Sequence, residues 1–447
     1  MPGNPMEGKD FPSGQNSPAS RSEPASRKPP PSVGPGDIAI GVVIGRASEN
    51  FDFFVYAIAS VLVFPWVFFP TSTQLEGTLY SFLIFSFAFI ARPLGTIAFM
   101  AIQRHYGRES KLMTALVLLG FSTAGIAFLP GYWELGFASV VLLSLFRLGQ
   151  GAALGGSWDG LASLLALSAP ANRRGWYAML GQLGAPVGFL MASGLFAALL
   201  YYLSQEEFLQ WGWRYPFYVA FAINVVALFA RLRLVSTDEY ERLLEERELQ
   251  PTSVIEMSKS QGRNILIGAL AALGSYAMFH IVTVFPLSWI ALYSSRPIPE
   301  FLLVQAAGAV LAALGVIASG WIADRLGRRT TLGTLACLIA AFSGLVPTLM
   351  DGGSTGQDIF ILLGFALLGL SYGQASGAVT ANFSPKYRYT GAALTSDLAW
   401  LVGAGFAPLV ALGLSAKFGL DYVSLYLLSG AVGSMAALSV NRALEIR

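Results

Sequence analysis

Long apolar stretches separated by short polar loops follow one another along most of the chain. Crossing a hydrocarbon core of roughly 30 Å takes about 20 helical residues. From the hydropathy pattern we place such segments at 38–68, 77–102, 111–129, 135–166, 175–203, 214–234, 264–293, 300–323, 330–349, 358–382, 389–416 and 421–441. The segments lack the alternation of a barrel strand, and lipid offers the backbone no hydrogen-bond partners. The pattern therefore predicts an all-α membrane protein with about twelve transmembrane helices.

Composition agrees with a membrane location and argues against several other classes of function. Apolar residues make up 54% of the chain and charged residues 12%, against about 25% charged residues in ordinary soluble domains. The net charge of +2 is too small to indicate a nucleic-acid partner. The single cysteine, Cys337, lies in an apolar run, so we expect neither disulfides nor a cysteine-based metal site.

No arrangement of residues typical of an enzyme or of a cofactor site is visible. The chain has no phosphate-cradling Gly-Lys-Ser or Gly-Lys-Thr loop, and no cluster of His, Cys and carboxylate residues has metal-ligand spacing. We therefore expect no enzymatic activity, no cofactor and no metal.

Charge and the content of Pro, Ser and Gly divide the chain into four parts. Residues 1–36 bury too little apolar surface to fold and are predicted to be a disordered cytoplasmic tail. The charged stretch 236–263 is predicted to be a cytoplasmic linker between a bundle of six helices at 37–235 and a second bundle at 264–447. The first long apolar run starts near Ile38, so we expect a first span there and no cleavable leader.

A short basic loop occurs twice, each time between two long apolar segments. It contains Gly107 and Arg108 in the first copy, and Gly327 and Arg328 in the second copy, 220 residues later. A motif that recurs at about half the chain length predicts a duplicated bundle, which is how many transporters are built.

The distribution of Lys and Arg among the short loops predicts the orientation in the membrane. Alternate loops are basic, whereas the loops between them are mostly acidic or neutral. Under the positive-inside rule both termini and the linker are cytoplasmic, and we expect a multi-pass protein of the cell (inner) membrane. The basic loops contain Arg104, Arg108, Lys111, Arg173, Arg174, Arg325, Arg328, Arg329, Lys386 and Arg388.

Six motifs, taken together and in order, give the chain a family resemblance. They are Glu-Asn-Phe-Asp-Phe-Phe-Val-Tyr at 49–56, Arg-Pro-Leu-Gly at 92–95, Arg-Leu-Gly-Gln-Gly at 147–151 with Gly-Gly-Ser-Trp at 155–158, Trp-Gly-Trp-Arg-Tyr-Pro-Phe at 211–217, Asp-Arg-Leu-Gly-Arg-Arg at 324–329, and Arg-Tyr-Thr-Gly at 388–391 followed by Pro408. In these motifs the chain resembles the metabolite:proton symporter branch of the major facilitator superfamily, with transporters of the proline/betaine, citrate, ketoglutarate and shikimate type. The resemblance runs from the first span to the last. It implies two pseudo-symmetric six-helix bundles, a substrate site near the membrane midplane between them, and a proton gradient as the energy source.

Two carboxylates in the first span are the candidates for proton coupling. Glu49, Asp52 and Tyr56 lie three or four residues apart, so they share one side of a helix. A carboxylate inside an apolar span is costly unless it faces a polar cavity or a partner, and Asp52 or Glu49 could carry the proton. The alternative is that Arg46, one turn before Glu49, neutralises it in a structural pair. In the family, a small or polar uncharged residue is usual where Arg46 stands.

Arg92 and Arg147 are the main cationic candidates for substrate binding. A guanidinium in a water-filled cavity binds a carboxylate through two parallel hydrogen bonds, which favours an organic anion as the substrate. Tyr56 and His280, which lies near the middle of the seventh span, complete the predicted substrate-binding set. Other interpretations stay open, since Arg92 could pair with Asp52 or with backbone carbonyls, and His280 could be a packing residue.

Aromatic residues of the seventh span have two interpretations. Tyr276, Trp289 and Tyr293 could line the cavity. Aromatic residues near the ends of spans more often form belts at the membrane surface. Both interpretations stay open for these three residues.

Three residues depart from the pattern of the resembling family. Ser157 replaces a glutamate, and Asp159 stands two positions later, where glycine is usual. Two helix positions are a rotation of roughly 200°, so Asp159 does not take over the missing role from the same face. Asp397 stands where Asn or Gln is expected, and a cavity carboxylate and an interfacial carboxylate both fit it.

The resemblance also implies a gate at the repeated basic loops. In the family the aspartate and the arginines of this motif latch helix ends when the cytoplasmic side is closed. The second copy retains that pattern in Asp324, Arg325, Gly327 and Arg328. In the first copy Arg104 stands at the aspartate position and His105 at the arginine position. We therefore expect a weaker latch there, compensated by Glu109 or by an acidic residue of the linker.

The sequence thus predicts a secondary transporter that takes up a small organic, carboxylate-bearing metabolite together with a proton. Two alternatives stay open, a symporter for a zwitterionic osmolyte and a transport-inactive membrane sensor. We expect the partners to be the metabolite, the proton and the lipid bilayer, with no nucleic acid and with the chain acting as a monomer. The identity of the substrate stays open.

Overall fold

The computed structural model describes residues 35–158, 160–170, 172–235, 242, 245, 249–376 and 383–440. Within these residues the chain is almost entirely helical and contains no strand, which confirms the all-α prediction. Most of the predicted tail 1–36, part of the predicted linker 236–263 and Asp159 lie outside the described residues. All described residues belong to one unit, 33–447.

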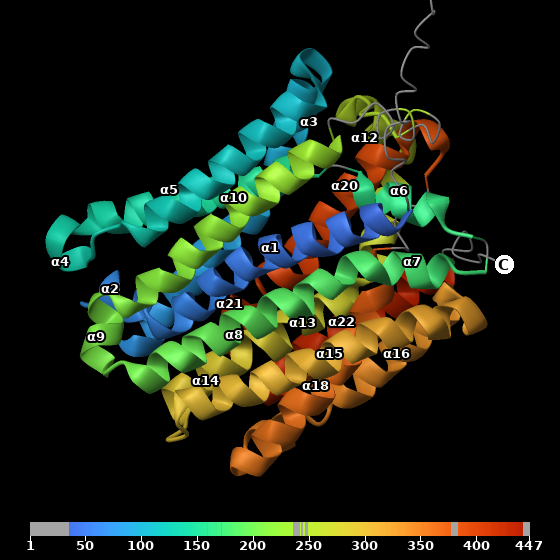
Figure 1. The fold of residues 1–447 in the computed structure, drawn as a ribbon. Coiled ribbons are helices and arrows are strands. Elements are labelled where there is room, and N and C mark those ends of the chain that lie inside the picture. The colour runs from blue at the N-terminus through green and yellow to red at the C-terminus, as the bar shows by residue number, and fades with distance from the viewer. Residues whose placement is uncertain are drawn as a thin grey trace, which may run out of the picture. The chain divides into compact units, whose positions relative to one another are not determined.

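The first set of helices runs from α1 to α10 (Figure 1). Its spans are helical because a helix satisfies every backbone hydrogen bond within one segment, as a lipid environment demands. The elements are α1 (Pro35–Leu62), α2 (Phe64–Val67), α3 (Gln74–Ala127), α4 (Tyr132–Leu135), α5 (Phe137–Gly156), α6 (Leu161–Ser168), α7 (Arg174–Leu180), the 3-10 turn η1 (Gly181–Leu183), α8 (Gly184–Tyr202), α9 (Gln205–Gln210), the 3-10 turn η2 (Gly212–Arg214) and α10 (Tyr215–Val235).

The second set runs from α12 to α22. Its elements are α12 (Val254–Ala271), α13 (Leu273–Thr283), α14 (Phe285–Tyr293), α15 (Ile298–Leu326), α16 (Arg328–Ser343), α17 (Val346–Met350), α18 (Gly353–Ala375), the 3-10 turn η3 (Pro385–Tyr387), α20 (Arg388–Ala399), the π-helical segment η4 (Trp400–Gly405), α21 (Ala407–Phe418) and α22 (Asp421–Val440). A π-helical turn inside a longer helix often marks a functional position, and η4 contains a residue of the candidate site described below.

Nine stretches of the described chain are helices long and apolar enough to cross a membrane. One of them, α3, contains two predicted spans, because its backbone leaves the helical conformation at Gly107. Two further predicted spans are not among these nine. Helix α1 is less apolar because it carries Arg46, Glu49 and Asp52, and α16 is shorter, with only 16 residues. Counted in this way, the described helices account for all twelve spans that the pattern predicts.

The same helix pairings occur in both sets. Helix α3 packs along α5 as α15 packs along α18, and α1 contacts α10 as α13 contacts α22. The approach is close because glycines lie at the crossings: a side chain at Gly95 would collide with the backbone of Ala152, and one at Gly369 with the backbone of Ala312. The pairings of the first set are thus repeated in the second.

The repeated basic loop has the same backbone conformation in both copies. Gly107 has a φ of 85° and Gly327 a φ of 84°, a left-handed region that glycine adopts without the steric cost of a Cβ atom. In each copy the glycine lets the chain turn directly from one helix into the next. We call the end of the unit that holds Gly107, Gly327 and the start of α12 the basic-loop end.

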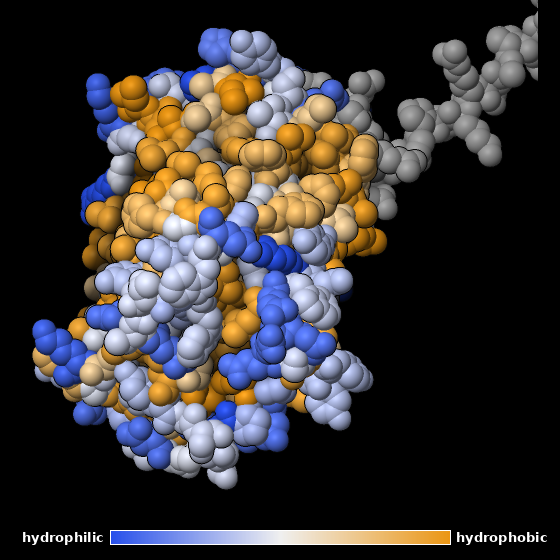
Figure 2. Space-filling model, turned by 90° about the vertical axis from the view of Figure 1, so that its left-hand side faces the viewer, coloured by the Kyte–Doolittle hydropathy of each residue, from blue (hydrophilic) through white to orange (hydrophobic). Residues whose placement is uncertain are grey.

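Apolar side chains are exposed along the spans, as is typical of helices that face lipid. Leu94, Phe121, Leu145 and Leu314 are examples from three different helices. In Figure 2, which faces the side of Figure 1 where α4 and α9 lie, hydrophobic residues gather in the upper part and most hydrophilic residues in the lower part.

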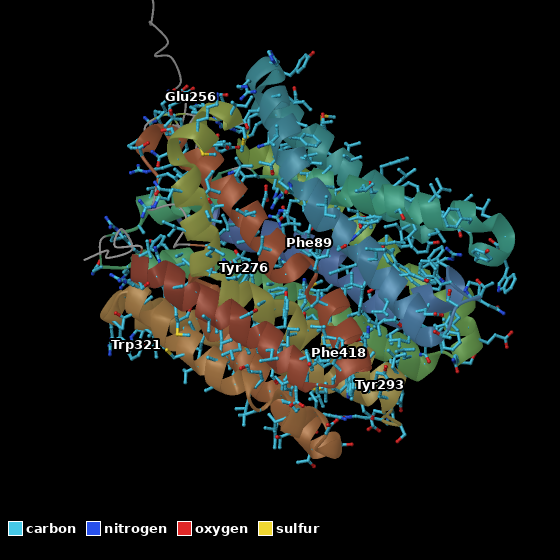
Figure 3. All side chains as sticks on the ribbon, turned by 180° about the vertical axis from the view of Figure 1, so that it is seen from behind. Phe89, Glu256, Tyr276, Tyr293, Trp321 and Phe418 are labelled. Atoms are coloured by element: carbon cyan, nitrogen blue, oxygen red, sulfur yellow. The ribbon has the colours of Figure 1, made fainter. Side chains whose placement is uncertain are left out.

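The two sets of helices contact each other mainly through α7 and α8 on one side and α15 on the other, and through α3 against α20 and η4. Figure 3 shows Phe89 of α3 and Tyr276 of α13 in the middle of the unit, between Glu256 toward one end and Tyr293 and Phe418 toward the other. The candidate site lies at the level of Phe89 and Tyr276.

Candidate functional site

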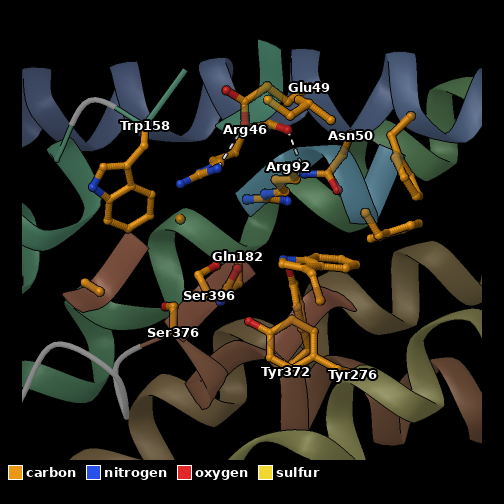
Figure 4. Close-up of a pocket in the computed structure, with 16 residues that line it drawn as sticks. Arg46, Glu49, Asn50, Arg92, Trp158, Gln182, Tyr276, Tyr372, Ser376 and Ser396 are labelled. Atoms are coloured by element: carbon orange, nitrogen blue, oxygen red, sulfur yellow. Dashed lines mark hydrogen bonds and ion pairs between the residues drawn. The ribbon is translucent and has the colours of Figure 1, made fainter. Parts of the chain in front are cut away.

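A cavity of about 80 Å³ lies between the two sets of helices. We call it the central pocket. Charged and hydroxyl-bearing side chains face one another across it, and aromatic rings close its ends (Figure 4). Its lining residues are Arg46, Glu49, Asn50, Phe53, Phe89, Arg92, Leu154, Trp158, Gly181, Gln182, Tyr276, Tyr372, Ser376, Ala392, Ser396 and Trp400. Both sets contribute, so any rearrangement of one set against the other changes this cavity.

Arg92 reaches the pocket from α3 and is paired with a carboxylate of the other set. Its Nε donates to Oδ1 of Asp397 on α20 at 2.7 Å, and Thr96, one turn further along α3, donates to Oδ2 at 2.5 Å. The side chains of Arg92 and Asp397 are 13% and 4% exposed. The interpretation of Arg92 as a partner of Asp52 or of backbone carbonyls is therefore wrong, because its partner is Asp397, 305 residues away. Asp397 is buried beside the pocket-lining residues Arg92 and Ser396, and its role stays a prediction.

Glu49 is held by two arginines rather than by Arg46 alone. Arg46 Nη1 donates to Oε2 at 2.9 Å, and Arg231 of α10 donates to Oε1 at 2.7 Å. The hydroxyl of Ser157 donates to the same Oε1 at 2.9 Å. Since Glu49 is buried, these three donors offset the loss of its hydration. The serine that replaces the family's glutamate thus acts as a donor to Glu49.

Three aromatic side chains separate the central pocket from a second polar region. Phe53, Phe89 and Trp400 all line the pocket, and each also contacts the ring of His280, with centroid separations of 5.4, 5.9 and 6.3 Å. We call these three side chains the aromatic layer. His280 is completely buried behind it and does not line the pocket.

A chain of hydrogen bonds behind the aromatic layer connects Arg147 with Asp52. Arg147 Nη1 donates to the side-chain oxygen of Gln150 at 3.0 Å, and the amide nitrogen of Gln150 donates to Thr123 Oγ1 at 3.0 Å. Thr123 in turn donates to the Asp52 carboxylate, at 2.9 Å from Oδ1. We call Arg147, Gln150, Thr123 and Asp52 the deep cluster. All four are buried, and none lines the central pocket.

Tyr56 and His280 adjoin the deep cluster rather than the pocket. The guanidinium carbon of Arg147 lies 3.9 Å from the centre of the Tyr56 ring, a favourable cation–π arrangement. His280 Nδ1 is 3.3 Å from Thr283 Oγ1, while its Nε2 has no hydrogen-bond partner among the described residues. Of the four predicted substrate-binding residues, the structure therefore puts Arg92 at the pocket and Arg147, Tyr56 and His280 behind the aromatic layer.

Sequence reasoning missed most of the second set's contribution to the pocket. Of the three aromatic residues predicted in the seventh span, Tyr276 lines the pocket and Trp289 and Tyr293 do not. Three other lining residues, Tyr372, Ser396 and Trp400, are indistinguishable by their spacing from packing residues. Only the way the helices pack brings them opposite Arg92.

The second copy of the basic loop joins the two sets at the basic-loop end. The Asp324 carboxylate accepts hydrogen bonds from the backbone N–H groups of Gly175 at 2.6 Å and Trp176 at 3.2 Å, at the start of α7. Arg328 is buried and donates to the backbone carbonyl of Arg174 at 3.3 Å. Arg325 instead stacks over the ring of Trp321, on its own helix.

The first copy contacts the other set through different groups. Arg104 donates to the backbone carbonyl of Thr252 at 3.3 Å, and in the part of the chain that the structure describes neither Glu109 nor an acidic linker side chain pairs with it. The hydroxyl of Tyr389, on α20, donates to the side-chain oxygen of Gln103 at 3.1 Å. Buried Lys111 donates to Gln103 as well and also contacts the backbone carbonyl of Trp158.

The described residues contain no group of three or more His, Cys, Asp or Glu side chains that could hold a metal ion. The polar groups around the central pocket are guanidinium, carboxylate, amide and hydroxyl groups. Such a set can bind a small polar solute by hydrogen bonds and ion pairs.

Known sequences and structures are similar to this chain over nearly its whole length. The sequence pattern of the Major Facilitator Superfamily matches residues 50–408. The chain is 34% identical to the "Inner membrane metabolite transport protein YhjE" of Escherichia coli (strain K12) over 407 residues, which covers 90% of this chain and 92% of the relative. It is 32% identical to the "Shikimate transporter" of the same organism over 417 residues, covering 90% and 93%.

One solved structure with a similar fold is the "Partially occluded inward open conformation of the xylose transporter XylE from E. coli". The TM-score is 0.68, with coverage of 90% of this chain and 98% of that chain. The sequence identity is 16%, so the likeness concerns the fold alone.

Proposed function

The chain belongs to the Major Facilitator Superfamily, and on that premise we propose that it carries a small, carboxylate-bearing metabolite across the membrane together with a proton. It is a membrane-spanning transporter of metabolites and not an enzyme. We assign the substrate to the central pocket, with alternating access between the two sets of helices as the mechanism. The proposal includes an inner-membrane location, cytoplasmic termini and a monomer.

The observation that carries the proposal is the arrangement of Arg92. Its Nε is taken by Asp397, but neither Nη1 nor Nη2 makes a hydrogen bond to another described residue, and Figure 4 shows the nitrogen end of its side chain facing the pocket. A guanidinium edge with two parallel N–H groups matches the two oxygens of a carboxylate. Arg46 adds positive charge on the same wall, although Glu49 offsets part of it.

The remaining lining fits a small polar solute with an unsaturated or cyclic body. The hydroxyl groups of Tyr276, Tyr372 and Ser396 can orient polar substituents, while Trp158 and Trp400 provide flat apolar surfaces. The pocket is therefore suited to a compact organic acid rather than to an inorganic ion.

We assign proton coupling to Asp52 in preference to Glu49. Glu49 already accepts hydrogen bonds from two guanidiniums and one hydroxyl, so its carboxylate is held in a buried group with two cationic partners. Asp52 accepts from the uncharged Thr123, and no ion pair to Asp52 is found among the described residues. A carboxylate in such surroundings can exist in either protonation state at a smaller cost.

Transport assays with purified protein in liposomes test the proposal. An inward proton gradient is imposed and the vesicles receive labelled monocarboxylates, dicarboxylates, aromatic acids and glycine betaine. We expect accumulation of one or more carboxylates, abolished by a protonophore. Binding without flux would overturn the transport assignment in favour of a sensor, and accumulation that ignores the protonophore would overturn proton coupling.

A zwitterionic osmolyte is the second candidate, because the pocket presents both signs of charge beside aromatic rings. Arg92 could bind the carboxylate of such a solute, while Trp400, Tyr276 and Phe89 could surround a quaternary ammonium group. Preferential accumulation of glycine betaine over all simple carboxylates in the same assay would favour this candidate.

A further inference from the structure

We propose that Asp397 takes up a proton when an anionic substrate binds to Arg92, so that anion and proton bind together at one place in the central pocket. The inference rests on the proposed function and adds a second proton-linked carboxylate to it. Asp52 lies behind the aromatic layer, whereas Asp397 shares its guanidinium partner directly with the proposed substrate.

Only one of the three guanidinium nitrogens of Arg92, its Nε, donates to a described residue. Asp397 occupies the Nε side of the guanidinium, and Thr96 binds the other carboxylate oxygen, so both Asp397 oxygens are held by α3. The two terminal nitrogens remain for a ligand on the pocket side. A substrate carboxylate can therefore reach Arg92 without first displacing Asp397.

Charge balance then links the anion to a proton. The empty pair of Arg92 and Asp397 is neutral, and a bound monocarboxylate would leave two negative charges on one positive charge in a buried site. Two carboxylates that share a site cannot both stay ionised at low cost. A proton from water, bound to an oxygen of Asp397, restores neutrality and turns the ion pair into a hydrogen bond between a carboxylic acid and the guanidinium.

The other groups near Asp397 make no ion pair with it in the described part of the chain. Arg46 of α1 donates instead to Glu49, which also accepts from Arg231, and Tyr276 of α13 carries an uncharged phenol. Helix α12 also packs against α20, and no ion pair between its charged residues and Asp397 is found in the described part of the chain. Arg92 is therefore the charged group that pairs with Asp397 among the described residues.

The same step loosens a contact between the two sets of helices. Arg92 and Thr96 belong to α3, and Asp397 belongs to α20, so their interaction holds the sets together beside the pocket. Neutralising Asp397 weakens that attachment only when anion and proton are both present. Binding of the two ligands would thus favour separation of α3 from α20, as coupled transport requires.

Proton uptake on binding, measured in detergent without any gradient, tests the inference. Purified protein in weakly buffered solution with a pH indicator receives shikimate or benzoate as monocarboxylate probes, and calorimetry gives the affinity between pH 5 and pH 9. For the unchanged chain we expect uptake of about one proton per bound anion, and an affinity that falls about tenfold per pH unit in the alkaline part of the range.

Asp397→Asn should bind the same probe with no proton uptake and with an affinity independent of pH. Asp397→Glu, which keeps a carboxylate, should restore proton uptake. Glu256→Gln, at an exposed carboxylate outside the pocket, is the control and should leave uptake on binding unchanged. Asp52→Asn is measured beside them. Monodispersity and thermal unfolding are recorded for every variant, and the Glu variant serves as the second test if the Asn variant does not fold.

The outcomes separate the inference from the proposed function. Undiminished proton uptake in Asp397→Asn overturns the inference and leaves the transport proposal intact. Loss of uptake in Asp52→Asn alone also overturns it, because Asp52 of the deep cluster would then be the group that binds the proton. Failure of the unchanged chain to bind any carboxylate overturns the proposed function, and the inference with it.

Discussion

The two sets of helices share their pairings but differ sharply in where they keep charge. Among the described residues, the first set buries Glu49, Asp52, Lys111, Arg147 and Arg231. The second set buries Asp397, Arg328 and His280, and of these only Asp397 takes part in the site around the pocket. The second set contributes mainly rings and hydroxyl groups there, among them Tyr276, Tyr372, Ser396 and Trp400.

This difference indicates a division of tasks within a duplicated architecture. Packing of paired helices needs small residues at the crossings, and both sets have kept them. Charge inside a membrane is costly unless it has a function or a partner, and the first set, which buries more of it, is the set that we propose recognises charged ligands. The second set contributes one buried charge to this region, the carboxylate of Asp397, which pairs with Arg92 of the first set.

Removing the Arg92 guanidinium should have the largest effect on transport. A small effect would contradict the assignment of charged-ligand recognition to the first set. Hydrogen bonds to charged groups contribute about 1.5–3 kcal/mol each, so Arg92→Gln should lower uptake and exchange of the transported carboxylate by about 10- to 100-fold. Arg46→Gln makes the same change on the same wall of the pocket. It is the matched control and should lower uptake and exchange by a smaller factor. Labelled uptake in liposomes measures both. A reversed order would mean that Arg46 binds the substrate.

Neutralising Asp52 should abolish accumulation but spare exchange. Asn imitates the protonated carboxyl, so the loaded carrier still crosses, whereas the empty carrier no longer cycles through the deprotonated state. The measurement compares gradient-driven uptake with exchange of labelled for unlabelled substrate. Gln150→Ala is the control, because it interrupts the deep cluster without removing the carboxylate. If Asp52→Asn still concentrates substrate with normal pH dependence, proton coupling does not use this residue.

Neutralising Glu49 should affect stability more than transport chemistry. Breaking a buried ion pair by removing one partner costs about 3–5 kcal/mol, and Glu49→Gln would leave Arg46 and Arg231 facing each other. Ser157→Ala removes only the hydroxyl donor and should cost about 1 kcal/mol. Thermal unfolding in detergent compares the two. Equal stability with lost proton dependence would reverse the assignments of Glu49 and Asp52.

Substitutions in the two basic loops should have the smallest effect, which we expect on gating at the basic-loop end. Asp324→Asn removes the negative charge and one of the two oxygens that accept backbone hydrogen bonds, whereas Arg104→Asp restores the family's carboxylate at a copy that already has other contacts. The reporter is Ser376→Cys, which places a cysteine in the lining of the central pocket, and the measurement is its labelling from the cytoplasmic side. Exposed charge pairs contribute about 0.2–1 kcal/mol, so Arg104→Asp should lower this labelling by no more than about fivefold. Cys337→Ser provides the background. No change would indicate that the altered copy has no effect on gating, and a change larger than that of Asp324→Asn would mean that the first copy, not the second, is the stronger latch.

The sequence predicted the architecture well because lipid imposes a simple rule on it. Apolar length alone located the spans, and the repeated Gly107 and Gly327 share the same left-handed turn. The resemblance to the major facilitator superfamily, based on six motifs, is confirmed by the family match over residues 50–408. The orientation, the domain limits and the roles of the site residues stay predictions.

Partners of the site residues were predictable only where they lie close in sequence. Arg46 and Glu49 are one helical turn apart, and the structure confirms the pairing that this spacing predicts. Asp397 is 305 residues from Arg92, and Arg231 is 182 residues from Glu49. No periodicity within a span carries information about a contact at that separation.

What the sequence determined by itself is therefore the set of helices, their duplication and the presence of costly charges inside them, because burial in lipid is decided segment by segment. What only the tertiary structure decided is which charges meet. Arg92 faces the pocket with Asp397, while Arg147 lies with Asp52 behind Phe53, Phe89 and Trp400. Helix packing across the two sets fixes that division, since it depends on rotation and contact between segments that are far apart in the chain.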